Sequence, residues 1–331
     1  MAMETLLITE EQAADLLSME EVIEAVERAL EGKATGDVMM PPKILIRFDQ
    51  YNGDLAAMIS YLGYSNMAGA KIGSVHGDNP RKFDLPVVVA AIVLVDPATG
   101  EPIAFMSGTD ITSYRTGAAG GVAAKYLANE DSEVVGMVGT GEQATTQLLA
   151  LSELFDGLNV KAYDLSEEQV TRFISKMDDR IDGSIEPVDS IQDAVAGSDI
   201  VVTTTPSKSP VISDEWVDDG THINAIGADS VGKRELDPEL LKRATIIVDD
   251  REQSAAVGET AFPINEGMLS PDDVHAELGD VVAGQEAGRT KSEEITVFDA
   301  TGLALEDVAA AAVVYEKAKE RGIGQTFSLV S

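Results

Sequence analysis

The sequence predicts an α/β protein that combines a doubly wound parallel sheet domain with a second, α+β domain. Two observations carry this prediction. After residue 133, short runs rich in Val and Ile alternate with longer amphipathic segments, which is the pattern of a parallel sheet with crossover helices. Between residues 43 and 105, β-rich runs instead follow one another and are separated by turn sequences, which is typical of an α+β unit.

The α+β domain is expected to begin with two short helices. Thr9-Glu-Glu-Gln12 and Ser18-Met-Glu-Glu21 both have the form of a capping box, and the apolar stripe after the second box ends near Gly36. Strands are expected next, where turn pairs such as Asn52-Gly53 separate the β-rich runs. The predicted strands cover residues 44–48, 56–62, 70–75 and 87–95.

The boundary between the two domains is expected near residue 129. Residues 117–126 are rich in Gly and Ala and predict a helix that packs closely against a neighbour. The polar phrase Asn129-Glu-Asp131 follows, and the Ala-rich helix predicted over 305–321 is of the kind that returns to a first domain. The predicted division is 1–128 with 304–331 for the α+β domain and 129–303 for the parallel sheet domain.

Strands and helices alternate regularly within 129–303. This alternation predicts a Rossmann-type doubly wound sheet. The predicted strands are 134–138, 160–163, 200–204, 222–226, 246–248 and 295–298, and the predicted helices include 142–155 and 167–177.

The chain is very acidic. It has 58 Asp and Glu against 24 Lys and Arg, a formal charge of −34, and yet 44% of its residues are hydrophobic. The apolar content argues against disorder, and the charge argues against nucleic acid or an anionic membrane as partner because both would be repelled. No apolar stretch is long enough to span a bilayer, no signal peptide pattern is present, and Cys is absent, so we expect a cytoplasmic protein without disulfides or thiol catalysis.

Such acidity is typical of a protein that works in molar salt. At about 1 M salt the Debye length falls to roughly 3 Å, and the repulsion between surface carboxylates is screened. Lys is also scarce, with 13 residues. We therefore expect a halophilic protein, with an acidic protein from an ordinary cytoplasm as the alternative.

The charge is distributed unevenly along the chain. Residues 131–331 carry 40 acids and 15 bases, whereas residues 43–115 carry seven acids and six bases. Cations retained in so anionic a chain suggest an anionic ligand. The candidates are Lys43, Arg47, Lys71 and Arg115, whereas Arg81 and Lys82 fit ordinary surface positions.

A dinucleotide-binding motif follows the first strand of the parallel sheet. Val138-Gly-Thr-Gly-Glu-Gln-Ala144 has the form G-x-G-x-x-A between a predicted strand and a predicted helix, which is the context that this motif requires. The first Gly permits the tight turn, the second lets the backbone approach a pyrophosphate, and the Ala lets the helix pack on the sheet. Because the helix N-terminus would bind the phosphate, the predicted cofactor residues here are Gly139, Thr140, Gly141, Glu142, Gln143 and Ala144.

Asp164 ends the next predicted strand, 20 residues after Ala144. A carboxylate there accepts hydrogen bonds from the ribose hydroxyls and would repel a 2′-phosphate, which favours NAD over NADP. Thr204 and Thr205, at a later strand end, and Thr116 complete the predicted cofactor set. The alternative is a glycine turn in an unrelated α/β fold, with Asp164 as a helix N-cap.

Seven phrases stand along the chain in a specific order and spacing: Pro41-Pro-Lys-Ile-Leu-Ile-Arg47, Gly69-Ala-Lys71, Asp78-Asn-Pro80 with Leu85-Pro86, Asp96-Pro-Ala-Thr-Gly-Glu-Pro102, Thr112-Ser-Tyr-Arg-Thr116, His222-Ile-Asn-Ala-Ile-Gly-Ala-Asp229 with Gly232-Lys-Arg-Glu-Leu236, and Phe298-Asp-Ala-Thr-Gly302. With these phrases the sequence resembles the ornithine cyclodeaminase and mu-crystallin family over nearly its whole length, including the archaeal-type alanine dehydrogenase branch. The resemblance implies a substrate-binding first domain that also forms a homodimer, and a central NAD(P)-binding domain. It also implies that Arg47, Lys71 and Arg115 bind the substrate and that Asp229 exchanges a proton with its nitrogen.

The requirements of the reaction independently favour the same residues. Oxidising a C–N bond next to a carboxylate requires a fixed carboxylate, a polarised nitrogen and a nicotinamide within hydride reach. Arg115 can hold a carboxylate by a planar fork, with Arg47 and Lys43 as further candidates, while Lys71 and Asp229 form the predicted catalytic pair. The structural alternatives are an ion pair for Arg115, a surface position for Lys71, a loop cap for Asp229 and a place outside the site for Arg47. No metal is expected, because His76, His222 and His275 lack metal-ligand spacing.

The strand before Lys71 indicates which member of the family this is. The cyclodeaminase branch has a Glu there, in a Glu-Leu-Met-Pro-like phrase, whereas this chain has Leu55-Ala-Ala-Met-Ile-Ser60. Without that acid, a small apolar amino acid fits better than ornithine. We therefore expect an NAD-dependent alanine dehydrogenase; the alternatives are ornithine cyclodeaminase, a ketimine reductase and a mu-crystallin-like protein that binds without turnover.

Overall fold

The computed structural model describes residues 4–328, so residues 1–3 and 329–331 of the predicted first domain lie outside the described residues. The chain divides into two compact units: Met1–Arg115 with Leu303–Ser331, called unit 1, and Thr116–Gly302, called unit 2. The division predicted from the sequence places the first crossing at 128/129, whereas the two units separate at 115/116. This separation falls inside helix α4 (Thr109–Leu127).

Unit 1 is built on a mainly antiparallel sheet in the order β16–β1–β7–β6–β5–β4–β2, with β3 also paired to β4. The predicted strands are confirmed, with somewhat different ends. The additional strands are runs of two to six residues, which carry little periodic signal. The bounds are β1 (Thr5–Ile8), β2 (Val38–Met39), β3 (Ile44–Phe48), β4 (Gly53–Leu62), β5 (Met67–His76), β6 (Val88–Val95), β7 (Pro102–Ser107) and β16 (Gln325–Phe327).

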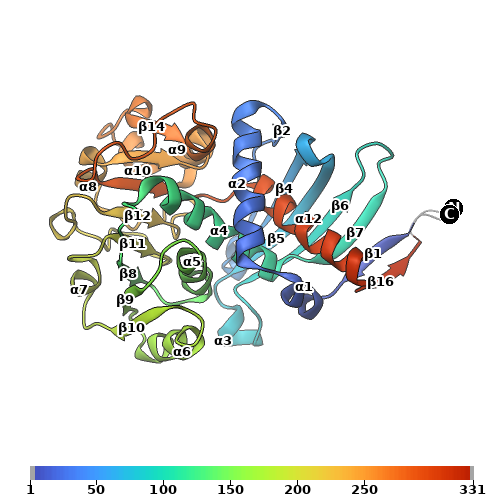
Figure 1. Ribbon diagram of the computed structural model, residues 1–331, viewed down its shortest axis with the longest axis horizontal. Helices are drawn as coiled ribbons and strands as arrows, with labels where there is room; N and C mark the ends of the chain where they lie inside the picture. The colour runs from blue at the N-terminus through green and yellow to red at the C-terminus, as the bar shows by residue number, and fades with distance from the viewer. Residues whose placement is uncertain (1–3, 329–331) are drawn as a thin grey trace. The chain divides into compact units, whose positions relative to one another are not determined.

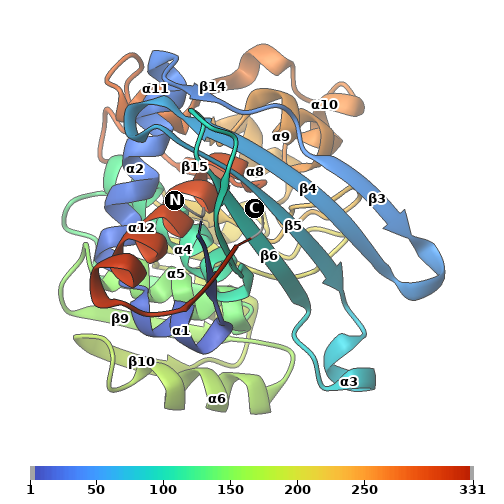
Figure 2. The ribbon, with the colours of Figure 1, turned by 90° about the vertical axis from the view of Figure 1, so that its right-hand side faces the viewer.

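Two long helices cover one face of this sheet. Helix α12 (Ala304–Arg321) packs on β4, β5 and β6, and α2 (Met19–Thr35) packs on α12 (Figure 2). The C-terminal helix therefore returns to the first unit, as expected. The capping box of α1 (Glu10–Leu16) is confirmed, whereas Ser18 makes no side-chain capping bond to α2, and a short α3 (Asn79–Phe83) lies between β5 and β6.

The strand β5 shows how closely α12 approaches the sheet. Its alternating burial directs Gly69, Lys71 and Gly73 to the helix side and Ile72 to the other side. A Cβ on Gly69 would lie 2.9 Å from the backbone oxygen of Val93 and 3.1 Å from a methyl of Val308. Glycine at this position therefore leaves the room that α12 occupies.

Unit 2 contains an eight-stranded parallel sheet in the order β10–β9–β8–β11–β12–β15–β13–β14. The chain moves outward from β8 through β9 and then continues on the other side from β11, so a topological switch point lies between β8 and β11. All six predicted strands are confirmed. The bounds are β8 (Val134–Val138), β9 (Leu158–Tyr163), β10 (Gly183–Pro187), β11 (Ile200–Thr203), β12 (His222–Ala225), β13 (Thr245–Val248), β14 (Val274–Glu277) and β15 (Thr296–Asp299).

The helices of unit 2 connect these strands, as Figure 1 shows along the coloured chain. The predicted helix over 167–177 is observed with the same ends, and the one predicted over 142–155 ends at Ser152. Short 3₁₀ helices lie at Asp49–Tyr51 and Gly63–Ser65 in unit 1 and at Asp214–Trp216 and Pro271–Asp273 in unit 2. The α-helical bounds are α5 (Glu142–Ser152), α6 (Glu167–Met177), α7 (Ile191–Val195), α8 (Pro238–Arg243), α9 (Arg251–Val257), α10 (Ala261–Asn265) and α11 (Leu278–Val282).

The small residues of α4 explain why most of this helix belongs to unit 2. A Cβ on Gly117 would lie 2.3 Å from the carbonyl oxygen of Thr146, and one on Gly121 would lie 2.9 Å from Cβ of Ala150, both on α5. The predicted close packing of this glycine-rich helix is therefore confirmed, and α5 is its neighbour. Within residues 4–328, every helix is too short or too polar to cross a membrane.

Candidate functional site

The turn after β8 brings two predicted cofactor residues together at the switch point of unit 2. Gly139 has a positive φ of 90°, and an added Cβ would lie 2.9 Å from Oγ1 of Thr204. That hydroxyl donates a hydrogen bond to the carbonyl oxygen of Gly139 at 3.1 Å. A side chain at Gly139 would therefore strain the backbone and displace the loop after β11.

The next residues leave the backbone at the start of α5 open, which is what the predicted phosphate site requires. Gly141 is the N-cap of α5, and a Cβ there would meet nothing within 4 Å, so the backbone is open to an approaching group. The first N–H groups of an α-helix have no acceptor within the helix, and its dipole favours negative charge there. Ala144 is fully buried, and the buried Oε1 of Gln143 has no hydrogen-bond partner among residues 4–328. The turn thus combines open backbone donors with a side-chain acceptor.

Asp164 follows β9 and tethers the same turn. Its Oδ2 accepts hydrogen bonds from the backbone N–H of Thr140 at 2.9 Å and from its hydroxyl at 3.3 Å, and its Oδ1 accepts one from the N–H of Ser166 at 3.0 Å. An ionised carboxylate has about four acceptor sites, so capacity remains for sugar hydroxyls. The next residue, Leu165, is 94% exposed and offers no cation for a 2′-phosphate.

The other predicted cofactor residues have protein partners. Oε1 of Glu142 accepts a hydrogen bond from Nζ of Lys176 at 2.8 Å. The carbonyl oxygen of Thr116 accepts a hydrogen bond from Nε2 of Gln147 at 2.8 Å. The backbone N–H of Thr205 donates to Oε1 of Glu235 at 2.6 Å. These contacts fix Glu142 on α5, Thr116 on α4 and Thr205 in the loop after β11.

Glu235 was not predicted from the sequence as part of the site, and it is fully buried. Its Oε2 accepts hydrogen bonds from Oγ1 of Thr203 at 2.7 Å and from the N–H of Gly227 at 2.8 Å, in addition to the bond from Thr205. This one carboxylate therefore ties the loop after β11 to the loop after β12. Burial raises its pKa despite these donors.

Two more buried acids continue this arrangement. Glu259 accepts the backbone N–H groups of Glu235 and Leu236, and Asp299 accepts those of Glu259 and Thr260. Burial raises the pKa of Glu259 well above its ordinary value and that of Asp299 to about 7. Glu235 and Glu259 stand among polar residues and glycine in the sequence, so no local pattern marked them as buried, and only the fold shows what they bind.

Asp229 lies in the loop after β12, two residues after Gly227, whose backbone N–H donates a hydrogen bond to Glu235. Its side chain is 46% exposed and pairs with Nζ of Lys233 at 2.6 Å. Ligands of open α/β sheets bind at the carboxyl ends of the strands, which is where this loop lies. Asp229 is therefore accessible at the carboxyl edge of the sheet of unit 2.

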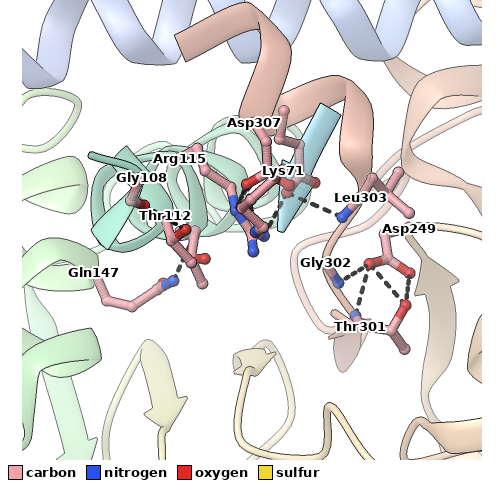
Figure 3. A network of polar contacts seen from close by, with 12 residues as sticks. Lys71, Gly108, Thr112, Arg115, Gln147, Asp249, Thr301, Gly302, Leu303 and Asp307 are labelled. Atoms are coloured by element: carbon pink, nitrogen blue, oxygen red, sulfur yellow. Dashed lines mark hydrogen bonds and ion pairs between the residues drawn. The ribbon is translucent and has the colours of Figure 1, made fainter. Parts of the chain in front are cut away.

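In unit 1, Lys71 of β5 and Arg115 of α4 converge on the acids Glu306 and Asp307 of α12 (Figure 3). Lys71 Nζ lies 2.7 Å and Arg115 Nε 2.9 Å from Oδ1 of Asp307. Arg115 Nη1 donates to Oε2 of Glu306 at 2.7 Å. Lys71 and Arg115 are only 4% and 7% exposed, so the surface position considered for Lys71 is wrong.

The cluster of Lys71, Arg115, Glu306 and Asp307 holds two cations and two carboxylates. Burial lowers the pKa of Lys71 to about 8, although Asp307 acts against this. Burial also opposes the charged form of Arg115, but the two carboxylates outweigh it and raise its pKa. The buried Oδ2 of Asp307 has no hydrogen-bond partner among residues 4–328, which costs about 1–3 kcal/mol.

The strand register places the remaining cations. In the strand register, Met58 of β4 lies opposite Lys71 of β5, and Asp54 of β4 lies opposite Arg47 of β3. Lys43 immediately precedes β3. With the β3–β4 register continued by one residue, Lys43 lies opposite Met58, and therefore on the same face of the sheet as Lys71 and at the same level along the strands. Arg47 shares that face but lies four residues further along, about 13 Å in the strand direction, and is exposed. The register therefore brings Lys43, rather than Arg47, into line with Lys71.

In the sequence, Glu306 and Asp307 stand out as a pair of acids within the Ala- and Val-rich segment that forms α12. Charged side chains with apolar neighbours on all sides of a helix are buried in many cases, and buried acids need partners. The sequence could not say which cations those would be. Among the described residues, no group of three or more potential metal ligands occurs.

The histidines have ordinary packing roles in the structure. The ring of His222 bonds to Oγ1 of Thr296 at 2.9 Å and to Oδ1 of Asn224 at 3.0 Å, and burial lowers its pKa to about 3. His275 bonds to the carbonyl oxygen of Ala287, and His76 stacks on Phe48.

Comparison with known proteins gives consistent matches along the chain. Residues 3–322 match the ornithine cyclodeaminase/mu-crystallin family. The alanine dehydrogenase of Archaeoglobus fulgidus is 49% identical over 324 residues, which cover 97% of this chain and 98% of that protein. A solved archaeal alanine dehydrogenase dimer with bound NAD is 48% identical and has a TM-score of 0.93, with 99% of this chain and 100% of that chain covered.

A reductase is also similar. The structure of Thermococcus litoralis Δ1-pyrroline-2-carboxylate reductase in complex with NADH and L-proline is 39% identical, with a TM-score of 0.93, and covers 97% of this chain and 99% of that chain. The similar proteins thus include both a dehydrogenase of an amino acid and a reductase of a cyclic imine.

Proposed function

The chain belongs to the ornithine cyclodeaminase/mu-crystallin family, and we propose from this that it is an NAD-dependent alanine dehydrogenase. The reaction converts L-alanine, NAD⁺ and water into pyruvate, NADH, ammonium and a proton. It is an enzyme of a family whose similar members bind NAD or NADH, and the glycine turn after β8 fits that cofactor through its open backbone and through Asp164.

The observation that carries alanine as substrate is the apolar character of the strands beside Lys71. Met58 of β4 and Ile92 of β6 pair with Lys71 in the sheet, and Ala56 lies two residues from Met58 on the same face of β4. Ala56 is the approximate position at which the cyclodeaminase branch has a Glu. The carboxylates that approach Lys71 come from α12 and are paired with Lys71 and Arg115. Without a further carboxylate on the sheet, this face can pack a methyl group, but it cannot neutralise the side-chain amine of ornithine.

Each proposed residue has a distinct task. Arg115 and Lys43 hold the substrate carboxylate, and Arg115 is suited to this because its Nη2 has no protein partner among residues 4–328. Asp229 takes a proton from the substrate ammonium, which frees the nitrogen lone pair to expel the hydride from Cα. Bound NAD⁺ supplies the hydride acceptor. Lys71 stabilises negative charge beside the reacting carbon and, with a pKa of about 8, can also exchange a proton near neutral pH.

The activity test is a set of three assays at molar KCl. We expect NADH oxidation with pyruvate plus ammonium, and no formation of proline from ornithine. NADH oxidation with Δ1-pyrroline-2-carboxylate is measured beside them. Proline formation alone would make the enzyme a cyclodeaminase, activity on the cyclic imine alone would make it a ketimine reductase, and NAD binding without any turnover would favour a binding protein.

Replacing Asp164 with Ser is expected to lower the preference for NAD over NADP about 10- to 100-fold. The reason is that a charge-assisted hydrogen bond to the ribose is lost together with the repulsion of a 2′-phosphate. The measurement is the ratio of kcat/KM for the two cofactors. Asp156→Ser, which removes an exposed acid outside the turn, is the matched control; an unchanged ratio in Asp164→Ser would contradict the role of this carboxylate.

We also propose that unit 1 forms a homodimer through the face of its sheet opposite to α12. Ile59, Ile72, Val89 and Phe105 all point to that face and are 44–49% exposed, although they are large and apolar. An exposed apolar face of this kind marks an interaction surface. The similar archaeal alanine dehydrogenase was solved as a dimer, which supports this proposal.

Replacing Ile72 with Glu is expected to halve the mass in light scattering, because it buries a charge in the proposed interface. The wild type is expected at twice 35.0 kDa. Ser74→Glu, further along the same face, tests how far the interface extends. A wild type that remains monomeric at high protein concentration would contradict the proposal.

A further inference from the structure

Asp307 differs from its neighbour Glu306 in what it binds. Glu306 accepts a hydrogen bond from the backbone N–H of Leu303 and so caps its own helix, besides pairing with Arg115. Asp307, among the described residues, accepts hydrogen bonds from Lys71 and Arg115 and from no donor of α12. The side chain of Asp307 therefore makes no capping hydrogen bond to the helix that carries it.

The geometry of Asp307 is also unlike that of a purely structural ion pair. A carboxylate that only neutralised two buried cations would offer one oxygen to each of them. Here both cations lie on Oδ1, at 2.7 and 2.9 Å, and the equally buried Oδ2 has no partner within residues 4–328. An unsatisfied buried oxygen is rare in folded proteins and calls for an explanation. Sharing one oxygen brings the ammonium of Lys71 and the guanidinium of Arg115 next to each other.

The packing around the cluster maintains this arrangement. The room left by Gly69 lets α12 lie against β5, two residues from Lys71, and Asp307 precedes the Val308 that occupies this room. Asp307 is completely buried, so water does not compete for its oxygens. Of the four cluster members, Lys71 comes from strand β5, Arg115 from helix α4, and Glu306 and Asp307 from helix α12, and therefore all come from elements that are rigid in themselves.

We propose that Asp307 is a positioning residue of the reaction, which uses one carboxylate oxygen to hold the Lys71 ammonium and the Arg115 guanidinium side by side, so that Arg115 meets the substrate carboxylate while Lys71 lies beside the reacting carbon. This inference rests on the proposed function, because that function gives Arg115 and Lys71 these two tasks. Asp307 touches no reacting atom in this proposal. It acts through Lys71 and Arg115.

Asp307 also influences the protonation of Lys71. The groups that face its ammonium are Asp307 and Glu306 of α12, which favour the charged form, and Arg115 of α4, which disfavours it along with burial. Asp307 is the larger of the two favourable influences. Replacing it with Asn removes the carboxylate charge but keeps the shape of the side chain, so the pKa of Lys71 should fall below about 8.

The experiment is an NMR titration of protein labelled with ¹³C at the lysine ε-carbon, with the Lys71 signal assigned by its loss in Lys71→Arg. In Asp307→Asn we expect Lys71 to titrate at least about one pH unit lower than in the wild type. Glu306→Gln is the matched control, since it removes an equally buried acid that does not touch Lys71, and its effect should be much smaller. A Lys71 titration that is unchanged in Asp307→Asn, or that shifts equally in both variants, overturns the proposal.

Kinetics provide the second measurement. In Asp307→Asn we expect kcat/KM for alanine to fall about 10²-fold, mainly through KM for alanine, with KM for NAD nearly unchanged. Asp307→Glu, which retains the charge, should restore part of the loss. Equal increases of both KM values, or a Glu variant no better than Asn, would indicate a merely structural role and overturn the proposal.

Failure of the variant to fold and failure of the proposed function can each be distinguished from failure of the proposed role of Asp307. If Asp307→Asn does not fold by circular dichroism, the wild type is titrated alone: a ¹³Cγ signal of Asp307 that moves at the pH at which Lys71 titrates supports the proposal, and an independent one overturns it. If alanine is not oxidised at all but the Lys71 titration behaves as expected, the proposed function fails while the pairing of Asp307 with Lys71 stands.

Discussion

Replacing Asp229 with Asn is expected to lower kcat for alanine oxidation about 10³-fold while the affinity for NAD remains close to normal. The amide cannot take a proton from the substrate ammonium, and a positioned acid or base contributes about 10²- to 10⁴-fold to rate. The affinity for NAD should persist because Asp229 lies in the loop after β12, whereas the glycine turn and Asp164 follow β8 and β9.

The measurement is steady-state kinetics at molar KCl together with NAD binding followed by fluorescence or calorimetry. Asp179→Asn makes the same chemical change at an exposed residue and is the matched control. Lys233→Met is a second comparison, because it frees Asp229 from its ion pair and should leave most of the rate intact. Near wild-type turnover in Asp229→Asn would remove Asp229 from the chemistry.

Lowering the salt concentration is expected to have the largest effect on stability. We propose that the protein is halophilic and cytoplasmic, and that its thermal midpoint falls steeply, by about 20 °C or more, when KCl is reduced from molar to about 0.1 M. Of the 58 acidic residues, six are buried: Glu235, Asp249, Glu259, Asp299, Glu306 and Asp307. The remaining acids are at least partly exposed, so salt can screen their mutual repulsion.

Circular dichroism over a KCl series measures this dependence, and activity is followed in parallel. Sucrose at matched osmolality is the control, because it changes water activity without screening charge. A midpoint that is independent of KCl would contradict the halophilic interpretation. An equal rise of the midpoint in sucrose would attribute the stabilisation to solute exclusion instead.

Much of unit 2 followed from local sequence, because its signals are local in the chain. The helix over 167–177 was predicted with its observed ends, since its apolar stripe and its N-cap Ser166 lie within one segment. The turn at Gly139 was predicted for the same reason. A positive φ is a requirement of the backbone at one residue, and the residue type reveals it directly.

The substrate half depended instead on contacts between distant segments. Sequence reasoning chose Lys71 and Arg115 from their charge and from the family resemblance, but it could not identify Asp307, which lies 236 residues from Lys71 and 192 from Arg115 along the chain. It also gave Arg47 and Lys43 as further candidates for the substrate carboxylate. Strand register decides which of two cations on one face is level with Lys71, and register is a property of paired strands.

The amino-acid sequence alone was sufficient for the fold class, for the cofactor turn and for the acidity that suggests a salt-rich environment, because backbone requirements, periodicity and charge are all written residue by residue. The partners of the buried ions became known only from the fold. A buried charge is tolerable only beside its counter-charge, and it is the packing of α12 on β5 that brings Asp307 to Lys71 and Arg115.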